Sequence, residues 1–172
     1  MSPTRRLLIG AIAVLAAAAG YAAGRSAFRP TQRVIQPIAF NHQKHAGELE
    51  IECRTCHELY ESGSHAGLPT LETCQACHSE PLTKSPEERK IFDLAKAGKN
   101  DVFRKLFRLA DHAFYTHRRH VVVAKLECQA CHGNIAKTTS PPERAQVRIS
   151  MAFCLGCHER AGASSDCTSC HR

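Results

Sequence analysis

The ten cysteines of this chain fall without remainder into five C-x-x-C-H motifs, and this feature constrains the fold more than any other. Two thiols three positions apart can bond to the two vinyl groups of one haem, and the histidine that follows can reach its iron. We therefore predict five covalently bound haems of the c type, each with an iron ligand from its own motif. The motifs comprise Cys53, Cys56 and His57; Cys74, Cys77 and His78; Cys128, Cys131 and His132; Cys154, Cys157 and His158; and Cys167, Cys170 and His171.

Three other uses of paired cysteines explain the pattern less well. A disulfide framework, common in small exported proteins, gives no reason for a histidine after every second cysteine. Structural zinc takes four ligands, and five identical triplets do not divide into tetrahedral sets. A thioredoxin-like C-x-x-C belongs to a βαβ pattern, which we do not find in this sequence.

The N-terminus predicts export from the cytoplasm. The Arg5-Arg6 pair precedes an apolar stretch from Leu7 to Gly24, which is the order of a targeting segment. A helix of that length spans about 27 Å, enough to cross a bilayer core. We expect residues 1–29 to be an uncleaved membrane anchor, and a cleaved signal peptide is the alternative. Both place residues 30–172 on the periplasmic side of the cytoplasmic membrane.

The net charge of +7 does not indicate nucleic-acid binding. Four of the 23 basic residues lie before residue 30, where no acidic residue occurs, so the rest of the chain carries 19 basic and 16 acidic residues. Five haems would add about ten propionate groups and make the loaded domain negative by roughly seven charges. We expect no nucleic-acid partner.

Four of the six remaining histidines form a repeat. The sequences that begin at Phe40 and Tyr115 both read aromatic-x-H-x-x-H, and each pair starts 11 residues before the next cysteine. In a helical turn, positions i and i+3 diverge by about 60°, so their imidazoles can serve two different irons. We predict that the histidines of both pairs are axial ligands: His42, His45, His117 and His120.

Three further residues bear on the fifth axial ligand. His65 lies in a turn-rich loop nine residues before Cys74; we predict that it ligates iron, and a solvated loop histidine is the alternative. His112 has no counterpart in the first half of the chain and is expected to be spare. Met151, three residues before Cys154, is expected to pack against a haem, with axial ligation as the alternative.

The motif spacing divides the domain into a two-haem half, a connector and a three-haem half, at residues 38–84, 85–111 and 112–172. In the connector, Ser85-Pro-Glu-Glu88 has the form of a capping box with proline at the first helical position, and it predicts a helix that ends near Gly98. A second short helix is expected at 101–109.

The expected fold is mostly α-helical with extensive loops and almost no sheet. Few long apolar runs follow residue 30, and a chain so poor in core-forming residues needs a cofactor to fold around. We therefore expect a small multihaem cytochrome c fold, with short helices and loops wrapped around five haems, after an N-terminal transmembrane helix.

These patterns resemble a known family. H-x-x-H ahead of C-x-x-C-H is similar to class III cytochromes c and their triple-haem relatives. The His65 loop, the Ser85 helix start and the stretches 109–121 and 150–158 resemble the membrane-anchored multihaem subunit of alternative complex III and of periplasmic quinone reductase complexes. The likeness spans about residues 38–172. Ala110 departs from it, because proline is usual there.

The resemblance implies a ligand scheme. In the class III pattern the first histidine of H-x-x-H serves the haem of the motif that follows, and the second serves the next haem along. That scheme leaves His65 for the C-terminal haem. The remaining assignments are His42 for the haem at Cys53 and Cys56, His45 for that at Cys74 and Cys77, His117 for that at Cys128 and Cys131, and His120 for that at Cys154 and Cys157.

The resemblance also implies a function in a respiratory chain. The subunit would carry electrons between a quinone-linked membrane complex and other redox proteins, held to the membrane by its N-terminal helix. Iron with two histidine ligands has no open position for a substrate, so we expect an electron carrier rather than an enzyme. The alternative is a multihaem reductase of a small oxyanion or nitrogen oxide.

Overall fold

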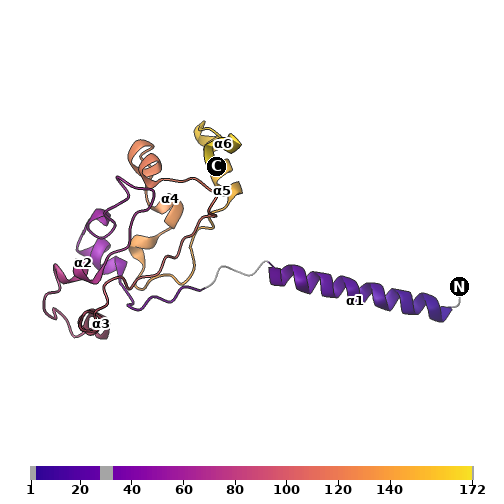
Figure 1. Cartoon of the computed structure of the whole chain (residues 1–172), viewed down its shortest axis with the longest axis horizontal. Helices are drawn as coiled ribbons and strands as arrows, with labels where there is room; N and C mark the ends of the chain where they lie inside the picture. The colour runs from indigo at the N-terminus through magenta and orange to yellow at the C-terminus, as the bar shows by residue number, and fades with distance from the viewer. Residues whose placement is uncertain (1–2, 28–32, 172) are drawn as a thin grey trace. The chain divides into compact units, whose positions relative to one another are not determined.

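A computed structural model describes residues 3–27 and 33–171, and the chain divides into two compact units, Met1–Arg33 and Val34–Arg172. The described residues of the first unit form helix α1, at Pro3–Ala27 (Figure 1). Its Pro3–Tyr21 part is long and apolar enough to cross a membrane. Ile12, Val14 and Leu15 are exposed on it. A membrane anchor and a signal sequence share these properties.

The second unit is built of short helical segments joined by loops. Within the described residues its one extended pairing is an antiparallel bridge between Ala113 and His171. This confirms the prediction of a mostly helical fold with almost no sheet. The segments are η1 (Gln43–Glu48), η2 (Cys53–Thr55), α2 (Leu71–Gln75), α3 (Pro86–Lys96), η3 (Arg118–Val123), α4 (Gln129–His132), η4 (Ile135–Lys137), α5 (Met151–Ala161) and α6 (Cys167–Cys170).

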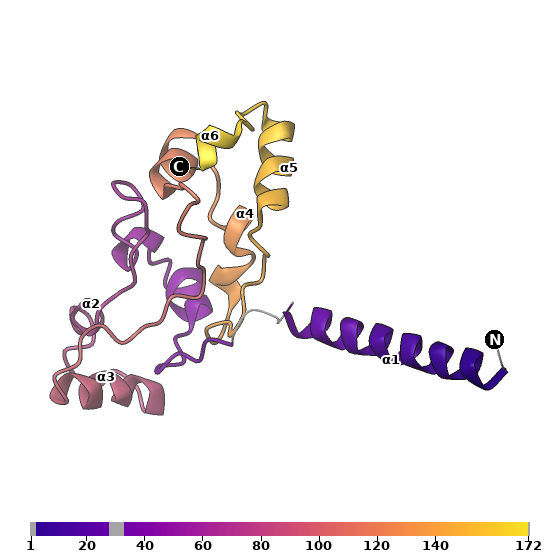
Figure 2. The same ribbon diagram turned by 45° about the vertical axis from the view of Figure 1, so that its right-hand side comes forward.

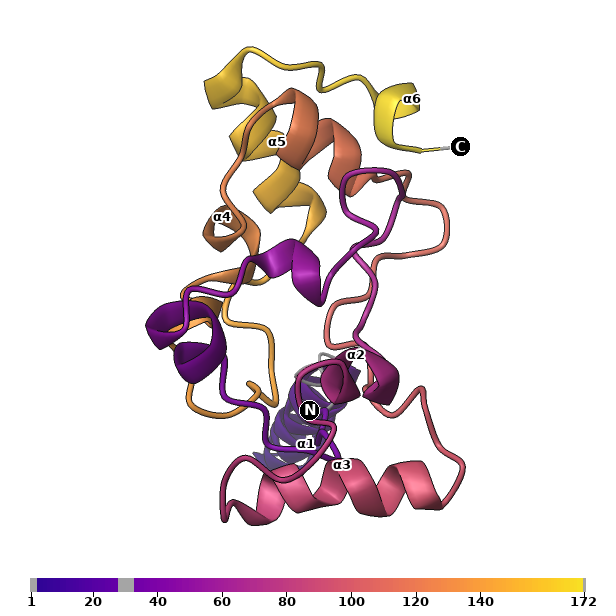
Figure 3. The ribbon, with the colours of Figure 1, turned by 90° about the vertical axis from the view of Figure 1, so that its left-hand side faces the viewer.

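The helices of the second unit are spread along its length. Figures 2 and 3 show α3 at one end and α5 and α6 at the other, with α4 between them. The two predicted halves interlock near the start of the unit. Val34 N–H donates to the Glu143 carbonyl at 2.8 Å, and Gln43 N–H donates to the Thr138 carbonyl at 3.0 Å. The start of the unit and the first segment of the two-haem half are therefore both held by the three-haem half.

The buried core is very small. Ile38, Leu71 and Ile91 are the buried apolar residues among those described, and Leu71 is only 1% exposed. Large apolar side chains lie exposed elsewhere in this unit, among them Leu49, Leu59, Leu68, Leu82, Phe114 and Val123. So much exposed apolar surface on so small a core fits a chain that folds around a bound group.

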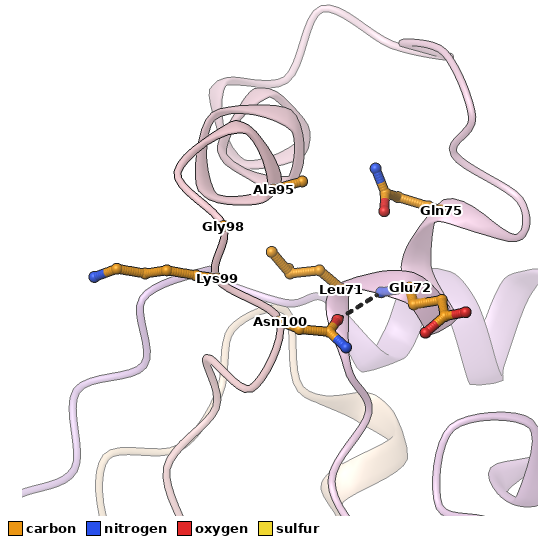
Figure 4. A pocket seen from close by; sticks show the side chains of 7 residues that line it. All are labelled: Leu71, Glu72, Gln75, Ala95, Gly98, Lys99 and Asn100. Carbon is orange, nitrogen blue, oxygen red and sulfur yellow. Dashed lines mark hydrogen bonds between the residues drawn. The ribbon is translucent and has the colours of Figure 1, made fainter.

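The start of α2 is fixed by Asn100, which follows the end of α3. Leu71 N–H donates to the Asn100 carbonyl and Glu72 N–H to its Oδ1, both at 3.1 Å. Figure 4 shows these residues around a surface hollow, with the second bond drawn as a dashed line. None of the residues that line this hollow is a cysteine or a histidine: Leu71, Glu72, Gln75, Ala95, Gly98, Lys99 and Asn100.

Helix α3 agrees with its prediction at both ends, but its capping differs. Ser85 is the N-cap and accepts a bond from Glu87 N–H at 3.2 Å, and Gly98 follows the helix with a φ of +69°. In a capping box the carboxylate of Glu88 would bond back to Ser85 N–H. Instead, Ser85 N–H donates to Thr83 Oγ1 at 3.1 Å, and Glu88 turns toward His78.

The predicted second helix at 101–109 is wrong: no helix forms there. The side chain of Gln36 pairs with the backbone of Arg104 in both directions, at 2.7 Å and 2.9 Å, as a neighbouring strand would. Phe103 packs against the core, and the rings of Phe107 and His132 meet edge to face with their centroids 4.5 Å apart. Tertiary contacts thus replace the local hydrogen bonds that a helix would need.

Candidate functional site

All five C-x-x-C-H motifs form the same helical turn. In four of them the histidine N–H donates to the carbonyl of the first cysteine, at 2.9 to 3.0 Å. The fifth, from Cys154 to His158, lies inside α5. The turn places both thiols and the imidazole on adjoining faces, as attachment to one haem requires. None of the ten cysteines forms a disulfide.

The imidazole rings are oriented through their Nδ1 atoms. A ring nitrogen that faces a carbonyl or carboxylate oxygen carries the proton, so the lone pair for a metal lies on Nε2. These bonds join His57 to Gly67 O (2.9 Å), His78 to Glu88 Oε1 (2.6 Å), His158 to Ser164 O (2.6 Å), His45 to Asn41 O (2.9 Å), His117 to Ser64 O (3.0 Å) and His120 to Thr116 O (2.9 Å).

The two H-x-x-H pairs have the same local structure. His42 and His117 each stand at the N-cap of a six-residue π-helix, η1 or η3. Glu50 and Lys125, just beyond these helices, both have positive φ, at 54° and 57°. The sequence predicts an ordinary helical turn, whereas the structure has the wider π turn, a geometry that is frequent at functional sites.

One aromatic ring positions both histidines of each pair. The ring of Phe40 stacks on that of His45, with centroids 4.4 Å apart, and meets that of His42 edge to face, with centroids 4.8 Å apart. Tyr115 stacks on His120 at 4.5 Å and meets His117 edge-on at 5.1 Å. This is the physical reason for an aromatic residue two positions before each pair, since the ring fixes two imidazoles in different directions.

The H-x-x-H histidines face motif histidines at a uniform spacing. Two imidazoles on opposite sides of one metal have ring centres about 6 Å apart, because each nitrogen lies about 2 Å from the metal and about 1 Å from its ring centre. The structure has this spacing three times: His45 to His78 at 6.2 Å, His120 to His158 at 6.2 Å and His117 to His132 at 6.3 Å.

His42 and His57 form a fourth neighbouring pair. Burial lowers the pKa of His42 to about 4, with smaller contributions from the nearby His57 and His45. Burial also lowers the pKa of His132, followed by the effects of His117 and His57. These rings are therefore neutral at physiological pH, which is the form that binds a metal.

The C-terminal motif has a different neighbour from the one expected. The ring of His112 stacks on that of His171 at 5.2 Å. The Ala113–His171 bridge and a 2.7 Å bond from Phe114 N–H to the Cys170 carbonyl hold the two segments together. No spacing in the sequence signals this pairing, because it joins segments about 60 residues apart.

His65 and Met151 lie elsewhere. The Nδ1 of His65 bonds to Ser64 Oγ at 2.8 Å, and the carbonyl of Ser64 receives the 3.0 Å bond from His117 Nδ1. The His65 loop thus positions His117. Met151 is 62% exposed at the start of α5, one residue after the N-cap Ser150.

Cysteines of different motifs are neighbours in space. Cys53 and Cys128, from different halves, line one surface hollow. Burial raises the pKa of Cys56, and the nearby Cys77 adds to the effect. Burial followed by the proximity of Cys157 raises the pKa of Cys131 in the same way. Burial followed by the proximity of Cys170 raises the pKa of Cys154. Each of the five sites therefore has a cysteine near one of another site, and only the link between Cys53 and Cys128 joins motifs that are not successive in the sequence.

Comparison with known proteins identifies the family. Residues 22–103 match the class III cytochrome c family, and residues 113–172 match cytochrome c7 and related cytochromes c. The chain belongs to the multihaem cytochromes c of the class III and c7 type. These matches confirm the predicted family, and they imply covalently bound haem c and a role in electron transfer rather than catalysis.

Two relatives come from Nitratidesulfovibrio vulgaris (strain Hildenborough). The cytochrome is 29% identical over 161 residues to the menaquinone reductase, multiheme cytochrome c subunit, covering 80% of this chain and 77% of that one. It is 22% identical over 151 residues to the high-molecular-weight cytochrome c, covering 86% of this chain. Of that larger relative's length it spans only 19%.

The side chains of this cytochrome fit the cofactor that its family implies. Where the Nδ1 bonds are described, they leave Nε2 free to bind iron, and three ring pairs have the spacing of two axial ligands. Haem would supply reversible one-electron chemistry at each site. The number of haems and the identity of each axial ligand stay predictions.

Proposed function

We propose that this cytochrome relays electrons through five covalently bound haems between a quinone-linked membrane complex and other redox proteins. The observation that carries the proposal is the repeated spacing of 6.2 to 6.3 Å between facing imidazoles. Iron held between two histidines exchanges electrons but has no position for a substrate. The relative named as a menaquinone reductase subunit supports a quinone-linked partner.

Each haem would be attached by the cysteines of one motif and held by two histidines. Four axial pairs follow both the ligand scheme and the neighbours described above. For the fifth, the stack on His171 favours His112 over His65. The proposed pairs are His57 with His42, His78 with His45, His132 with His117, His158 with His120 and His171 with His112.

The neighbouring sites give the relay an order. Each H-x-x-H turn would supply ligands to two irons of its own half, and so would link these two haems. The hollow lined by Cys53 and Cys128 would link the two halves. The segment from His112 to Phe114 adds the last site. Named by their first cysteines, the haems would follow the order Cys74, Cys53, Cys128, Cys154 and Cys167.

The two ends of this order are the natural points of exchange with partners. The site at Cys74 lies beside α3, and the site at Cys167 lies on α6 at the opposite end of the unit (Figure 3). Helix α1 would hold the domain at the periplasmic face of the cytoplasmic membrane, or would serve as its export signal.

Mass spectrometry of the denatured protein tests the haem number. The expected mass exceeds that of the bare chain by five haem masses, since thioether bonds survive denaturation. A variant with both Cys167 and Cys170 replaced by Ser is the matched control and should carry four. Fewer than five haems on the natural chain would contradict the proposal.

Carbon monoxide distinguishes the relay from the alternative of a reductase. The reduced relay should bind none, because every iron already has two axial ligands. Binding of one equivalent by the fully loaded protein would reveal an open iron and favour the reductase.

A further inference from the structure

Glu88 is the one buried charged residue among those described, with 7% of its surface exposed. It stands in the first turn of α3, and its carboxylate accepts four hydrogen bonds. His78 Nδ1 donates to Oε1 at 2.6 Å, as does Leu82 N–H at 2.8 Å. Thr83 donates to Oε2 through its N–H at 2.8 Å and its hydroxyl at 2.5 Å. The anion is fully paired inside the protein.

This partner distinguishes His78 from the seven other histidines whose Nδ1 partner is described. The Nδ1 atoms of His57, His158, His45, His117 and His120 meet backbone carbonyls, and those of His42 and His65 meet hydroxyl oxygens. Those oxygens are neutral. A full negative charge therefore stands behind one proposed iron ligand of this cytochrome.

We propose that Glu88 lowers the reduction potential of the haem at Cys74 and Cys77 by its bond to His78. This inference rests on the proposed function, because it takes His78 as an iron ligand. A carboxylate that accepts the Nδ1 proton makes the imidazole a stronger electron donor. Stronger donation stabilises ferric over ferrous iron, and hydrogen bonding around the ligands is a recognised determinant of haem potential.

The surroundings keep this charge in place and effective. The N–H groups at the start of α3 favour a negative charge there, and the four donors hold the carboxylate ionised. Bonds from Thr83 and then Leu82 lead the effects that lower the pKa of Glu88 to about 2. Away from water, the field of the carboxylate is less screened at His78.

The consequence concerns the direction of the relay. The site at Cys74 stands at one end of the proposed order, beside α3. A low potential at an end makes an electron on that haem pass readily to the four others, and it makes return unfavourable. Glu88 is then a positioning residue that biases the relay away from the α3 end.

The alternative is a purely structural role, in which Glu88 only holds the 82–83 loop against α3 by hydrogen bonds. Replacing Glu88 by Gln removes the charge and keeps the size of the side chain. Glu87→Gln is the matched control, because Glu87 lies in the same turn and bonds to Ala39 N–H and Lys90 rather than to a histidine. Thr83→Val removes the hydrogen bond from the Thr83 hydroxyl to Glu88 and leaves the bond between Glu88 and His78.

A redox titration followed by haem absorbance gives the decisive readout. In E88Q, one of the five potentials should rise, with at least a tenfold change in that haem's ratio of oxidised to reduced form, or about 59 mV for a one-electron couple. E87Q should leave all potentials unchanged. T83V should leave that potential unchanged or lower it, because a competing donor to the carboxylate is gone.

Three results would overturn the inference, and a fourth would overturn the proposed function on which it rests. E88Q with all haems bound and every potential unchanged shows that the charge has no effect. An equal rise of that potential in E88Q and T83V shows that Glu88 has a merely structural role. If E88Q fails to bind all its haems, a rise of the potential in T83V refutes the inference. A natural chain without a haem at Cys74 and Cys77 refutes the proposed function instead.

Discussion

Replacing His112 by Ala should open one iron of the five, at the C-terminal haem. The rings of His112 and His171 are 5.2 Å apart, about 1 Å closer than the three pairs at 6.2 to 6.3 Å. One iron between them needs an outward shift of about 1 Å, shared between two exposed segments. The bridge from Ala113 to His171 and the bond from Phe114 N–H to the Cys170 carbonyl would both have to tolerate this small shift.

The expected size of the effect follows from the count of sites. Loss of one axial imidazole converts one six-coordinate, low-spin ferric haem to a five-coordinate, high-spin one. About a fifth of the low-spin intensity in electron paramagnetic resonance should therefore disappear, because one of five motifs is affected. The reduced variant should also bind one equivalent of carbon monoxide, where the natural protein binds none.

His65→Ala is the matched control, since both histidines are exposed on loops. Its low-spin signals should stay unchanged. The opposite outcome, a high-spin signal from His65→Ala and none from His112→Ala, would refute the geometric argument and support the ligand scheme that the family resemblance implies. Two unchanged spectra with a methionine-to-iron absorption band would assign the fifth iron to Met151.

Three further measurements test the fold and the anchor. Leu71→Ala should lower the free energy of unfolding by about 3 kcal/mol in denaturant titration, because removing a fully buried leucine side chain leaves a cavity. The control, Lys84→Ala at an exposed position, should change that free energy by less than about 0.5 kcal/mol. Asn100→Ala removes the side-chain acceptor at the start of α2 and should cost about 1 kcal/mol, measured in the same way; no change would show that the 3.1 Å bond to Glu72 N–H is dispensable. Membrane fractionation should release the protein with detergent but not with high salt, and a soluble form that begins near residue 20–25 would instead indicate signal cleavage.

Local chemistry was readable from the sequence wherever a few contiguous residues carry it. The C-x-x-C-H motifs need only one helical turn to place two thiols and an imidazole together, and all five adopt that turn. The start of α3 was predictable for the same reason, since Ser85 and Pro86 act within one turn. The sparse core was foreseeable from composition, because few apolar runs follow residue 30.

Local signals failed where a distant residue offered a better partner. The 101–109 segment has an apolar spacing suited to a helix, but the backbone N–H and carbonyl of Arg104 form hydrogen bonds with the side chain of Gln36 instead. Glu88 has the position of a capping-box carboxylate, yet it serves His78 and the 82–83 loop. In the first case a contact across the fold replaces a bond within the segment, and in the second a contact with residues five to ten positions earlier does so.

The sequence by itself determined which residues can hold haem, because attachment and the motif ligand depend on spacings of a few residues. Only the tertiary structure decided which histidines face each other, since that depends on how separate turns pack. His112 and His171 meet because a backbone bridge joins segments about 60 residues apart. The carboxylate behind His78 likewise comes from a helix ten residues further on, and spacing alone does not specify a contact through space.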